Sequence, residues 1–261
     1  MSTVLKATNV TMQFGGLRAV DSVDMEIAQG EIHALIGPNG AGKTTFFNIV
    51  SGIYVPTEGT VEFNGEDITK LKPYQVTEKG IARTFQNILL FENMNIVQNV
   101  MVGEHTRTDS SLLGSVLRTR KSRREEQACY ERAMETLEFV GMADVADQNA
   151  SGLPYGKKRI LEIARALASQ PRILMLDEPA AGMNSTESAA LRDLIFRIRD
   201  KGVTVLLVEH DMKFVSDISD MITVLDHGQK ICEGVPQKTL NDPRVIEAYL
   251  GREDEDEEEQ A

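Results

Sequence analysis

The sequence predicts an α/β fold with a parallel sheet, an antiparallel β region before it and a helical insertion within it. Strand and helix signals alternate in the second half of the chain, as in parallel strands joined by crossover helices. One short apolar run ends in a glycine-rich loop, and another ends in two carboxylates. With 261 residues, the chain is long enough for one large domain or for a large domain with a small insertion.

The N-terminal third predicts β-structure followed by a helix. Apolar and polar residues alternate over the first thirty positions, and glycines interrupt them, which predicts short antiparallel strands. Further strands are expected at 31–36 and, as a hairpin with an Asn64-Gly65 turn, at 59–65. A helix is expected at 43–51.

Strand signals vanish between about residues 91 and 149. Ala128, Ala133, Leu137 and Val140 instead recur at near-helical spacing, so we predict a mainly helical insertion. Alternation then returns. Helices are expected at 160–169 and 186–201, and strands at 173–176 and 203–208.

Charge and composition restrict the partners. No apolar run approaches the roughly 18 residues of a membrane-spanning helix, and the N-terminus lacks the pattern of a secretory signal. Net charge is −12, and seven consecutive acids at 253–259 predict a disordered acidic tail over 251–261. A basic cluster within 107–124 lacks interleaved aromatic residues, so we expect no nucleic acid partner. Cys129 and Cys232 are expected to be reduced thiols.

The glycine-rich loop predicts a nucleotide site. It reads Gly-Pro-Asn-Gly-Ala-Gly-Lys-Thr and fits the pattern G-x-x-x-x-G-K-[ST] between a strand and a helix. In such loops, backbone N–H groups surround phosphate oxygens at a helix N-terminus. Lys43 would reach the β- and γ-phosphates, and the Thr44 hydroxyl would ligate Mg²⁺. The predicted nucleotide-binding residues of the loop are Gly37, Pro38, Asn39, Gly40, Ala41, Gly42, Lys43, Thr44 and Thr45.

The second apolar strand delivers two carboxylates to the carboxyl edge of the sheet, where ligands bind in α/β folds. We expect Asp177 to hold Mg²⁺ through water. Glu178 would orient the attacking water or accept its proton.

Further motifs resemble those of the ATP-binding cassette (ABC) ATPases. The segment Leu153-Pro154-Tyr155-Gly156-Lys157 resembles the L-S-G-G-Q signature, about twenty residues before the acidic strand. Gln86, His210 and the segment 181–184 match the Q-loop glutamine, the switch histidine and the D-loop, and Phe14 matches the aromatic residue that stacks on adenine. Six motifs stand in the family's order. For His33, His105 and His227 we expect no such role.

The resemblance implies a mechanism. The family closes as a head-to-tail dimer, in which the signature of one subunit meets the ATP on the phosphate loop of the other. The catalytic residues would be Glu178, His210, Gln86 and Lys43. Metal contacts would come from Thr44, Gln86 and Asp177. Nucleotide would also be bound by Phe14 and by residues 153–157.

This chain departs from the family pattern at several motif positions. Pro154 replaces the signature serine, Lys157 the glutamine and Asn184 the D-loop aspartate, while Phe14 offers a ring without a hydroxyl. These exchanges leave the main catalytic groups in place but bear on dimer closure.

The implied fold is a P-loop NTPase core of the ABC ATPase type with an antiparallel β subdomain and an inserted helical subdomain. We assign 1–90 and 160–250 to the ATP-binding core and its β subdomain, and 91–159 to the helical subdomain with the signature at its end.

Finer resemblance is to the ATP-binding subunits of branched-chain amino acid importers, in the segments 80–94, 161–167 and 176–184. It implies two polytopic membrane subunits, a second ATP-binding subunit, identical or related, and indirectly a periplasmic solute-binding protein. The subunit would act at the cytoplasmic face of the plasma membrane. Residues 87–94 are apolar with few charges and are the expected contact with a membrane subunit, unless that loop packs inward.

Alternatives remain open at this stage. Similar cassettes serve urea or short amide import and lipopolysaccharide export. A soluble ATPase of the iron–sulfur assembly type is a further alternative. A regulatory cassette that binds ATP without hydrolysing it is disfavoured by Glu178 and His210.

Overall fold

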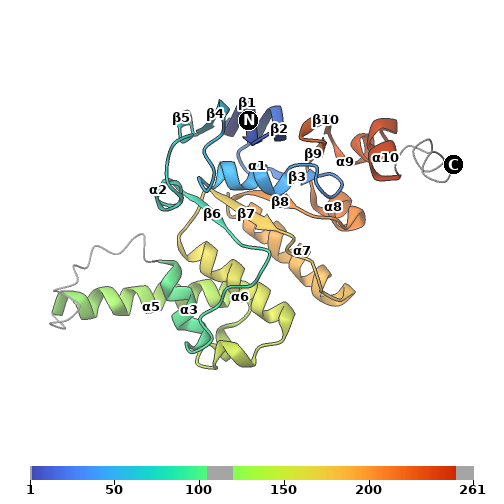
Figure 1. Ribbon diagram of the computed structural model, residues 1–261. Coiled ribbons are helices and arrows are strands. Elements are labelled where there is room, and N and C mark those ends of the chain that lie inside the picture. Colours follow the sequence, from blue (N-terminus) through green and yellow to red (C-terminus); the bar gives the residue numbers. More distant parts are fainter. Residues whose placement is uncertain (1, 105–119, 251–261) are drawn as a thin grey trace. The chain divides into compact units, whose positions relative to one another are not determined.

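The computed structural model describes residues 2–104 and 120–250 (Figure 1). The chain divides into two compact units, one formed by residues 1–73 and 195–261 and the other by 74–194. The predicted acidic tail, His105 and most of the basic cluster lie outside the described residues.

The first unit contains an antiparallel sheet in the order β2-β1-β4-β5. Its strands are β1 (Thr3–Phe14), β2 (Leu17–Ala28), β4 (Glu58–Phe63) and β5 (Glu66–Asp67). The predicted hairpin is confirmed, because Asn64 and Gly65 have φ values of 51° and 78°, as a two-residue hairpin turn requires. The first two strands have twelve residues each and are longer than the short strands expected.

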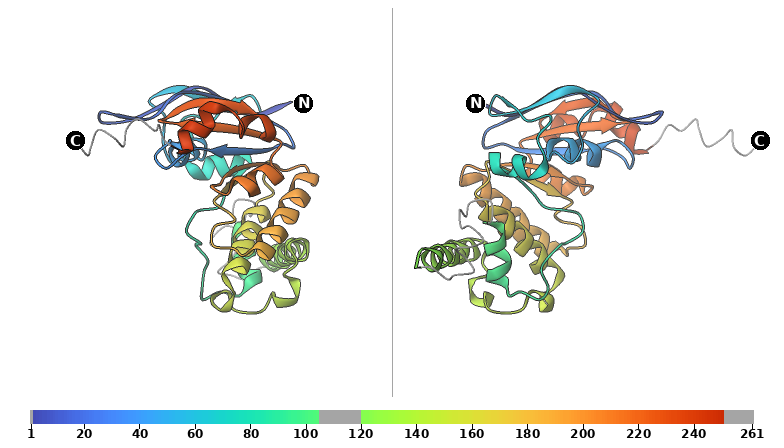
Figure 2. Two further views of the ribbon diagram at one scale, coloured as in Figure 1. Left: turned by 90° about the vertical axis from the view of Figure 1, so that its right-hand side faces the viewer. Right: turned by 60° about the vertical axis from the view of Figure 1, so that its left-hand side comes forward.

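The same unit contains parallel strands. β3 (Ile32–Ile36) lies between β8 (Thr204–Val208) and β9 (Met221–Asp226) and is parallel to both, while β10 (Gln229–Gly234) is antiparallel to β9. All residues of β3 and β8 are buried, which explains why four of the five residues in each strand are apolar. Figure 2 shows β1 and β2 (dark blue) as a layer beside β9 and β10 (red). The helices of this unit are α1 (Lys43–Val50), α8 (Met212–Ile218), α9 (Pro236–Thr239) and α10 (Pro243–Leu250).

The second unit pairs β6 (Ile81–Arg83) with β7 (Ile173–Asp177) in parallel. Three helices pack against one another in it: α3 (Ile96–Gly103), α5 (Arg120–Val140) and α6 (Tyr155–Ala168). Two short 3₁₀ turns, 143–145 and 150–152, separate α5 from α6. Helix α2 (Pro73–Lys79) precedes β6, and α7 (Ser185–Asp200) runs from the second unit into the first.

The helical character of residues 91–159 is confirmed for its described part, whose only β-type pairing is a single bridge between Asn95 and Asn149. Ala133, Leu137 and Val140 are buried on one face of α5. Helix α6 begins at Tyr155, five residues before the predicted start. Its first turn carries exposed residues, so the apolar periodicity that predicted the helix appears only further along.

Both cysteines and His33 lie in the described part of the chain. Both cysteines are free thiols, and burial raises the pKa of Cys129 to about 11. His33 is fully buried between Glu31 and Thr223, at 2.6 and 2.8 Å from its ring nitrogens, a structural arrangement. Among the residues that the structure describes, no helix is long and apolar enough to cross a membrane.

Candidate functional site

The loop between β3 and α1 has a backbone that only glycine can adopt at two positions. Gly37 and Gly42 have φ values of 152° and 99°. A Cβ atom on Gly37 would lie 2.1 Å from the carbonyl oxygen of Leu225, and one on Gly42 would lie 2.3 Å from that of Ala19. The loop is therefore closely packed on neighbouring backbone at both ends, and this explains the glycine spacing of the motif.

Lys43 begins α1, and its ammonium group turns back over the loop. Nζ donates to the carbonyl oxygens of Gly37 and Pro38 at 2.7 and 2.8 Å, and the residue is 6% exposed. Thr44 is exposed on the first turn of the helix, and Thr45 is half-buried. A cation and a helix N-terminus thus lie at one loop, an arrangement suited to phosphate.

We expect Gly37→Ala to abolish nucleotide binding and to lower the thermal stability of the protein. The alanine side chain would collide with the backbone of β9, which cannot give way as a flexible side chain could. Gly40→Ala is the matched control, because Gly40 also has a positive φ of 81° but open space around its Cβ position. The control should lose only about 1–2 kcal/mol from backbone strain. Thermal unfolding and fluorescent-nucleotide titration measure both effects; equal losses in the two variants would contradict the steric explanation.

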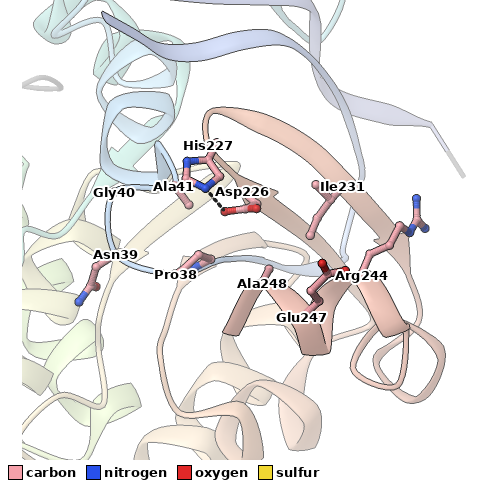
Figure 3. A pocket seen from close by; sticks show the side chains of 10 residues that line it. All are labelled: Pro38, Asn39, Gly40, Ala41, Asp226, His227, Ile231, Arg244, Glu247 and Ala248. Atoms are coloured by element: carbon pink, nitrogen blue, oxygen red, sulfur yellow. Dashed lines mark ion pairs between the residues drawn. The ribbon is translucent and has the colours of Figure 1, made fainter. Parts of the chain in front are cut away.

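A cavity of about 740 Å³ borders the outer side of this loop (Figure 3). Residues 38–41 form one wall, and side chains of β9, β10 and α10 form the others, among them Asp226, Ile231, Arg244 and Glu247. Neither Lys43 nor Thr44 lines this cavity. The cavity therefore adjoins the phosphate loop without marking the position of the phosphates.

Glu178 directly follows β7 and has a left-handed backbone, with φ at 48°. A residue other than glycine with this conformation is strained, and such residues concentrate at functional sites. Gln86 donates from Nε2 to Oε2 of Glu178 over 3.1 Å, so two predicted catalytic residues are brought together within the second unit. Asp177, one residue earlier, is buried and forms an ion pair with Arg83.

The signature segment forms the start of α6. Pro154 is the N-cap residue and provides no side-chain cap, so the exchange of serine for proline removes a hydroxyl from the cap position. Gly156 is buried against Glu187, since a Cβ there would lie 2.6 Å from Oε1. The ring of Tyr155 lies over Gly182, 3.2 Å from the position of a Cβ atom. The signature and D-loop segments therefore contact each other.

Asn184, which replaces the D-loop aspartate, caps α7. Its Oδ1 accepts from the backbone N–H groups of Thr186 and Glu187, and Glu187 Oε2 accepts from the backbone N–H of Asn184. This reciprocal capping box stabilises the N-terminus of α7. Asparagine at this position, in place of aspartate, therefore still caps α7.

Arg159 is a functional candidate that the sequence did not single out. It is fully buried and donates to the backbone carbonyl oxygens of Phe85 and Gln86 at 2.7 and 2.9 Å, and to Glu162 at 2.9 Å. Glu162 in turn accepts from the N–H of Phe85 at 3.2 Å. Helix α6 therefore fixes the backbone of the Q-loop. Nothing in the sequence signalled this role, because Arg159 is the last residue of a basic run.

Two further predicted residues lie in the first unit. Phe14 is 43% exposed at the end of β1, in edge-to-face contact with Tyr54 at 5.4 Å between ring centroids. His210 is exposed after β8, immediately before Asp211, whose carboxylate caps α8. The first unit therefore carries the phosphate loop, Phe14 and His210, and the second carries Gln86, the signature, Asp177 and Glu178.

Comparison with known proteins gives concordant matches. The family model "ABC transporter" matches residues 20–181, and "Branched-chain amino acid ATP-binding cassette transporter" matches residues 229–255. The chain is 44% identical over 249 residues to "High-affinity branched-chain amino acid transport ATP-binding protein BraF" of Pseudomonas aeruginosa, covering 95% of this chain and 98% of that one.

Solved structures are similar along nearly the whole chain. The ADP conformation of MJ1267, an ATP-binding cassette of an ABC transporter, is 32% identical with a TM-score of 0.85, covering 97% of this chain and 100% of that one. The dimeric post-hydrolysis structure of the ATP-binding cassette MJ0796, bound to ADP and Pi, is 25% identical with a TM-score of 0.74, covering 89% and 98%. The phosphate loop, the acidic strand and these matches lead to one conclusion: the chain belongs to the ABC transporter family, as an ATP-binding and ATP-hydrolysing cassette.

Proposed function

We propose that this ATPase energises the import of branched-chain amino acids. The observation that carries the proposal is the similarity to branched-chain amino acid transport subunits, which spans nearly the full chain and includes a specific match at 229–255. Urea or short amide import and lipopolysaccharide export are the alternatives, since the cassette itself does not contact the solute.

Each predicted site residue has a role in ATP binding or hydrolysis in this proposal. Phe14 would stack on adenine, and residues 37–45 would hold the phosphates, with Lys43 at the β- and γ-phosphates. Glu178 would orient the attacking water and accept its proton, and His210 would hydrogen-bond the γ-phosphate and keep water and Glu178 in line. Gln86, which already contacts Glu178, supports this geometry.

Mg²⁺ fits the donor set, which consists of a hydroxyl, an amide and a carboxylate. Thr44, Gln86 and Asp177 would hold it, the last through water. When bound, the ion would neutralise negative charge that develops on the phosphates during hydrolysis. The described residues contain no group of three or more His, Cys, Asp or Glu that could hold a metal ion.

We propose that two cassettes, identical or related, close head to tail on ATP. The first N–H groups of α6 have no intrahelical acceptor, so the signature presents positive potential beside Gly156. In the dimer this potential would lie at the γ-phosphate held by the other subunit. Lys157, exposed on the same turn, would add charge where the family has glutamine.

A groove in the second unit is the proposed contact with a polytopic membrane subunit. It has a volume of about 430 Å³, and its lining includes Phe85, Leu89, Phe91, Val102 and Arg165. Leu89 and Phe91 are 60% and 47% exposed, whereas Ile88 and Leu90 are half-buried. The exposed apolar side chains favour docking over an inward-packed loop. Such docking would hold the subunit peripherally at the cytoplasmic face of the plasma membrane.

Leu89→Glu is expected to abolish co-purification with the membrane subunits, because a charge would be buried at the interface. The basal ATPase of the isolated cassette should remain within a factor of about two, since Leu89 does not belong to the proposed site. Leu17→Glu is the matched control, an equally exposed leucine in the first unit. Normal complex formation by Leu89→Glu would remove this groove as the docking surface.

Reconstitution tests the transported solute. The cassette, its membrane subunits and the solute-binding protein are assembled in liposomes, and ATPase activity is measured with candidate solutes. Leucine, isoleucine or valine should stimulate hydrolysis. Stimulation by urea or a short amide alone would replace the proposed substrate class.

A further inference from the structure

Arg83 and Asp177 form a buried ion pair at the carboxyl ends of two parallel strands. Arg83 is the last residue of β6, and Asp177 is the last residue of β7. Nη2 of Arg83 lies 2.8 Å from Oδ2 of Asp177, and each side chain is 7% exposed. At this burial the two charges attract each other strongly, and removing one would leave the other poorly solvated.

The backbone around the pair is fixed on both strands. The N–H of Thr84 donates to the carbonyl oxygen of Met175 at 2.9 Å, and the N–H of Asp177 lies 3.4 Å from Oγ1 of Thr84. The ion pair engages Oδ2, one of the two oxygens of the carboxylate, and a carboxylate has further acceptor positions. Arg83 therefore orients a carboxylate that can still accept from a metal-bound water.

The other side of Arg83 faces the groove described above. Its guanidinium lies over the ring of Phe85, 5.2 Å from the centroid, and both side chains line that groove. Phe85 is 40% exposed, so an occupant of the groove can contact the ring on which the guanidinium is stacked. One side chain thus connects the groove surface with Asp177.

We propose that Arg83 is a positioning residue that orients Asp177 for Mg²⁺ and transmits occupancy of the groove to it. The second half of the proposal rests on the proposed function, because it takes the occupant of the groove to be a membrane subunit. A docked helix that shifts Phe85 shifts the guanidinium, and the guanidinium shifts the carboxylate. Loss of Arg83 therefore weakens the metal contact and uncouples it from docking.

The first test uses the isolated cassette and a fluorescent ATP analogue. Arg83→Gln is expected to raise the Mg²⁺ concentration needed for half-maximal analogue binding by about tenfold, the usual effect of losing a group that orients a metal ligand. Binding without Mg²⁺ should not change. Arg83→Lys keeps the charge but not the planar group. It should need a Mg²⁺ concentration between those of the wild type and Arg83→Gln.

Arg165→Gln is the matched control. Arg165 lines the same groove, and its guanidinium carbon lies 5.9 Å from the centroid of the Phe91 ring. Unlike Arg83, it donates to the carbonyl oxygen of Leu89. It should leave the Mg²⁺ dependence unchanged. A tenfold shift in this control as well, or wild-type Mg²⁺ dependence in Arg83→Gln, would overturn the proposal.

A double variant covers the case in which Arg83→Gln does not fold. Arg83→Gln with Asp177→Asn removes both charges and leaves no buried ion alone. If Arg83 acts through Asp177, the double variant has the same Mg²⁺ dependence as Asp177→Asn. A further weakening in the double variant would show that Arg83 acts elsewhere.

The second test measures stimulation of ATPase by the membrane subunits at saturating Mg²⁺. Arg83→Gln should bind these subunits and lose at least half of the stimulation. Normal stimulation would overturn the link to the groove. Failure of the wild-type cassette to bind any membrane subunit would instead refute the proposed function, while the Mg²⁺ result on the isolated cassette would stand.

Discussion

Exchange of Glu178 for glutamine is expected to slow ATP hydrolysis by roughly 10²–10⁴-fold while ATP still binds. Glutamine keeps the size of the side chain and one acceptor oxygen but cannot accept a proton at neutral pH. The contact with Gln86 at 3.1 Å and the left-handed backbone hold this side chain in a defined position. Steady-state phosphate release measures the loss, and equilibrium binding of a fluorescent ATP analogue measures what is retained.

Asp193→Asn is the control for Glu178→Gln. It also converts a carboxylate to an amide in the second unit, but its side chain is 67% exposed on α7. This control should hydrolyse ATP at the wild-type rate. Near-normal turnover in Glu178→Gln would rule out Glu178 as the catalytic base.

Replacement of Arg159 by methionine is expected to reduce the free energy of unfolding by about 3–5 kcal/mol. The carboxylate of Glu162 would remain buried without its cationic partner, and two backbone carbonyl oxygens of the Q-loop would lose a donor. Thermal and denaturant unfolding measure the loss. Arg192→Met is the control, because Arg192 pairs with Asp193 at the surface, where ion pairs contribute about 0–1 kcal/mol.

The pH dependence of this loss follows from the pKa of Glu162. Burial raises that pKa above its ordinary value, although hydrogen bonds from Phe85 and the charge of Arg159 oppose the shift. A raised carboxyl pKa means that the folded protein holds the proton more tightly than the unfolded chain, so stability increases as the pH falls toward the ordinary glutamate pKa. Without Arg159 the pKa rises further, and the deficit of Arg159→Met relative to wild type should shrink on acidification. A deficit that is constant from neutral to acidic pH would contradict this account.

Much of the fold could be predicted because burial and turn chemistry leave local patterns. β3, β7 and β8 are buried along their whole length, and four of the five residues in each strand are apolar. Gly37, Asn64 and Gly65 mark backbone conformations that few residues adopt. The predicted start of α6 was too late because the first turn includes exposed residues and carries no apolar periodicity.

The contacts within the candidate site could not be predicted in the same way. Arg83 and Asp177 are 94 residues apart in the chain, and only the parallel pairing of β6 with β7 brings them together. Arg159 resembled its neighbour Lys158 in the sequence, yet it is fully buried. A single sequence carries no information on which strands pair. It therefore cannot show whether an arginine is buried, or which carboxylate it pairs with.

The two hydrogen bonds of Lys43 bear on the thermodynamics of ATP recognition. Since Gly37 and Pro38 already restrain the ammonium group, the side chain loses little rotational freedom when a triphosphate binds. The glycine-specified loop is similarly fixed by the backbones of β2 and β9. Because the lysine and the loop are already held in place, calorimetry of nucleotide binding to the isolated cassette should detect only a small heat-capacity change.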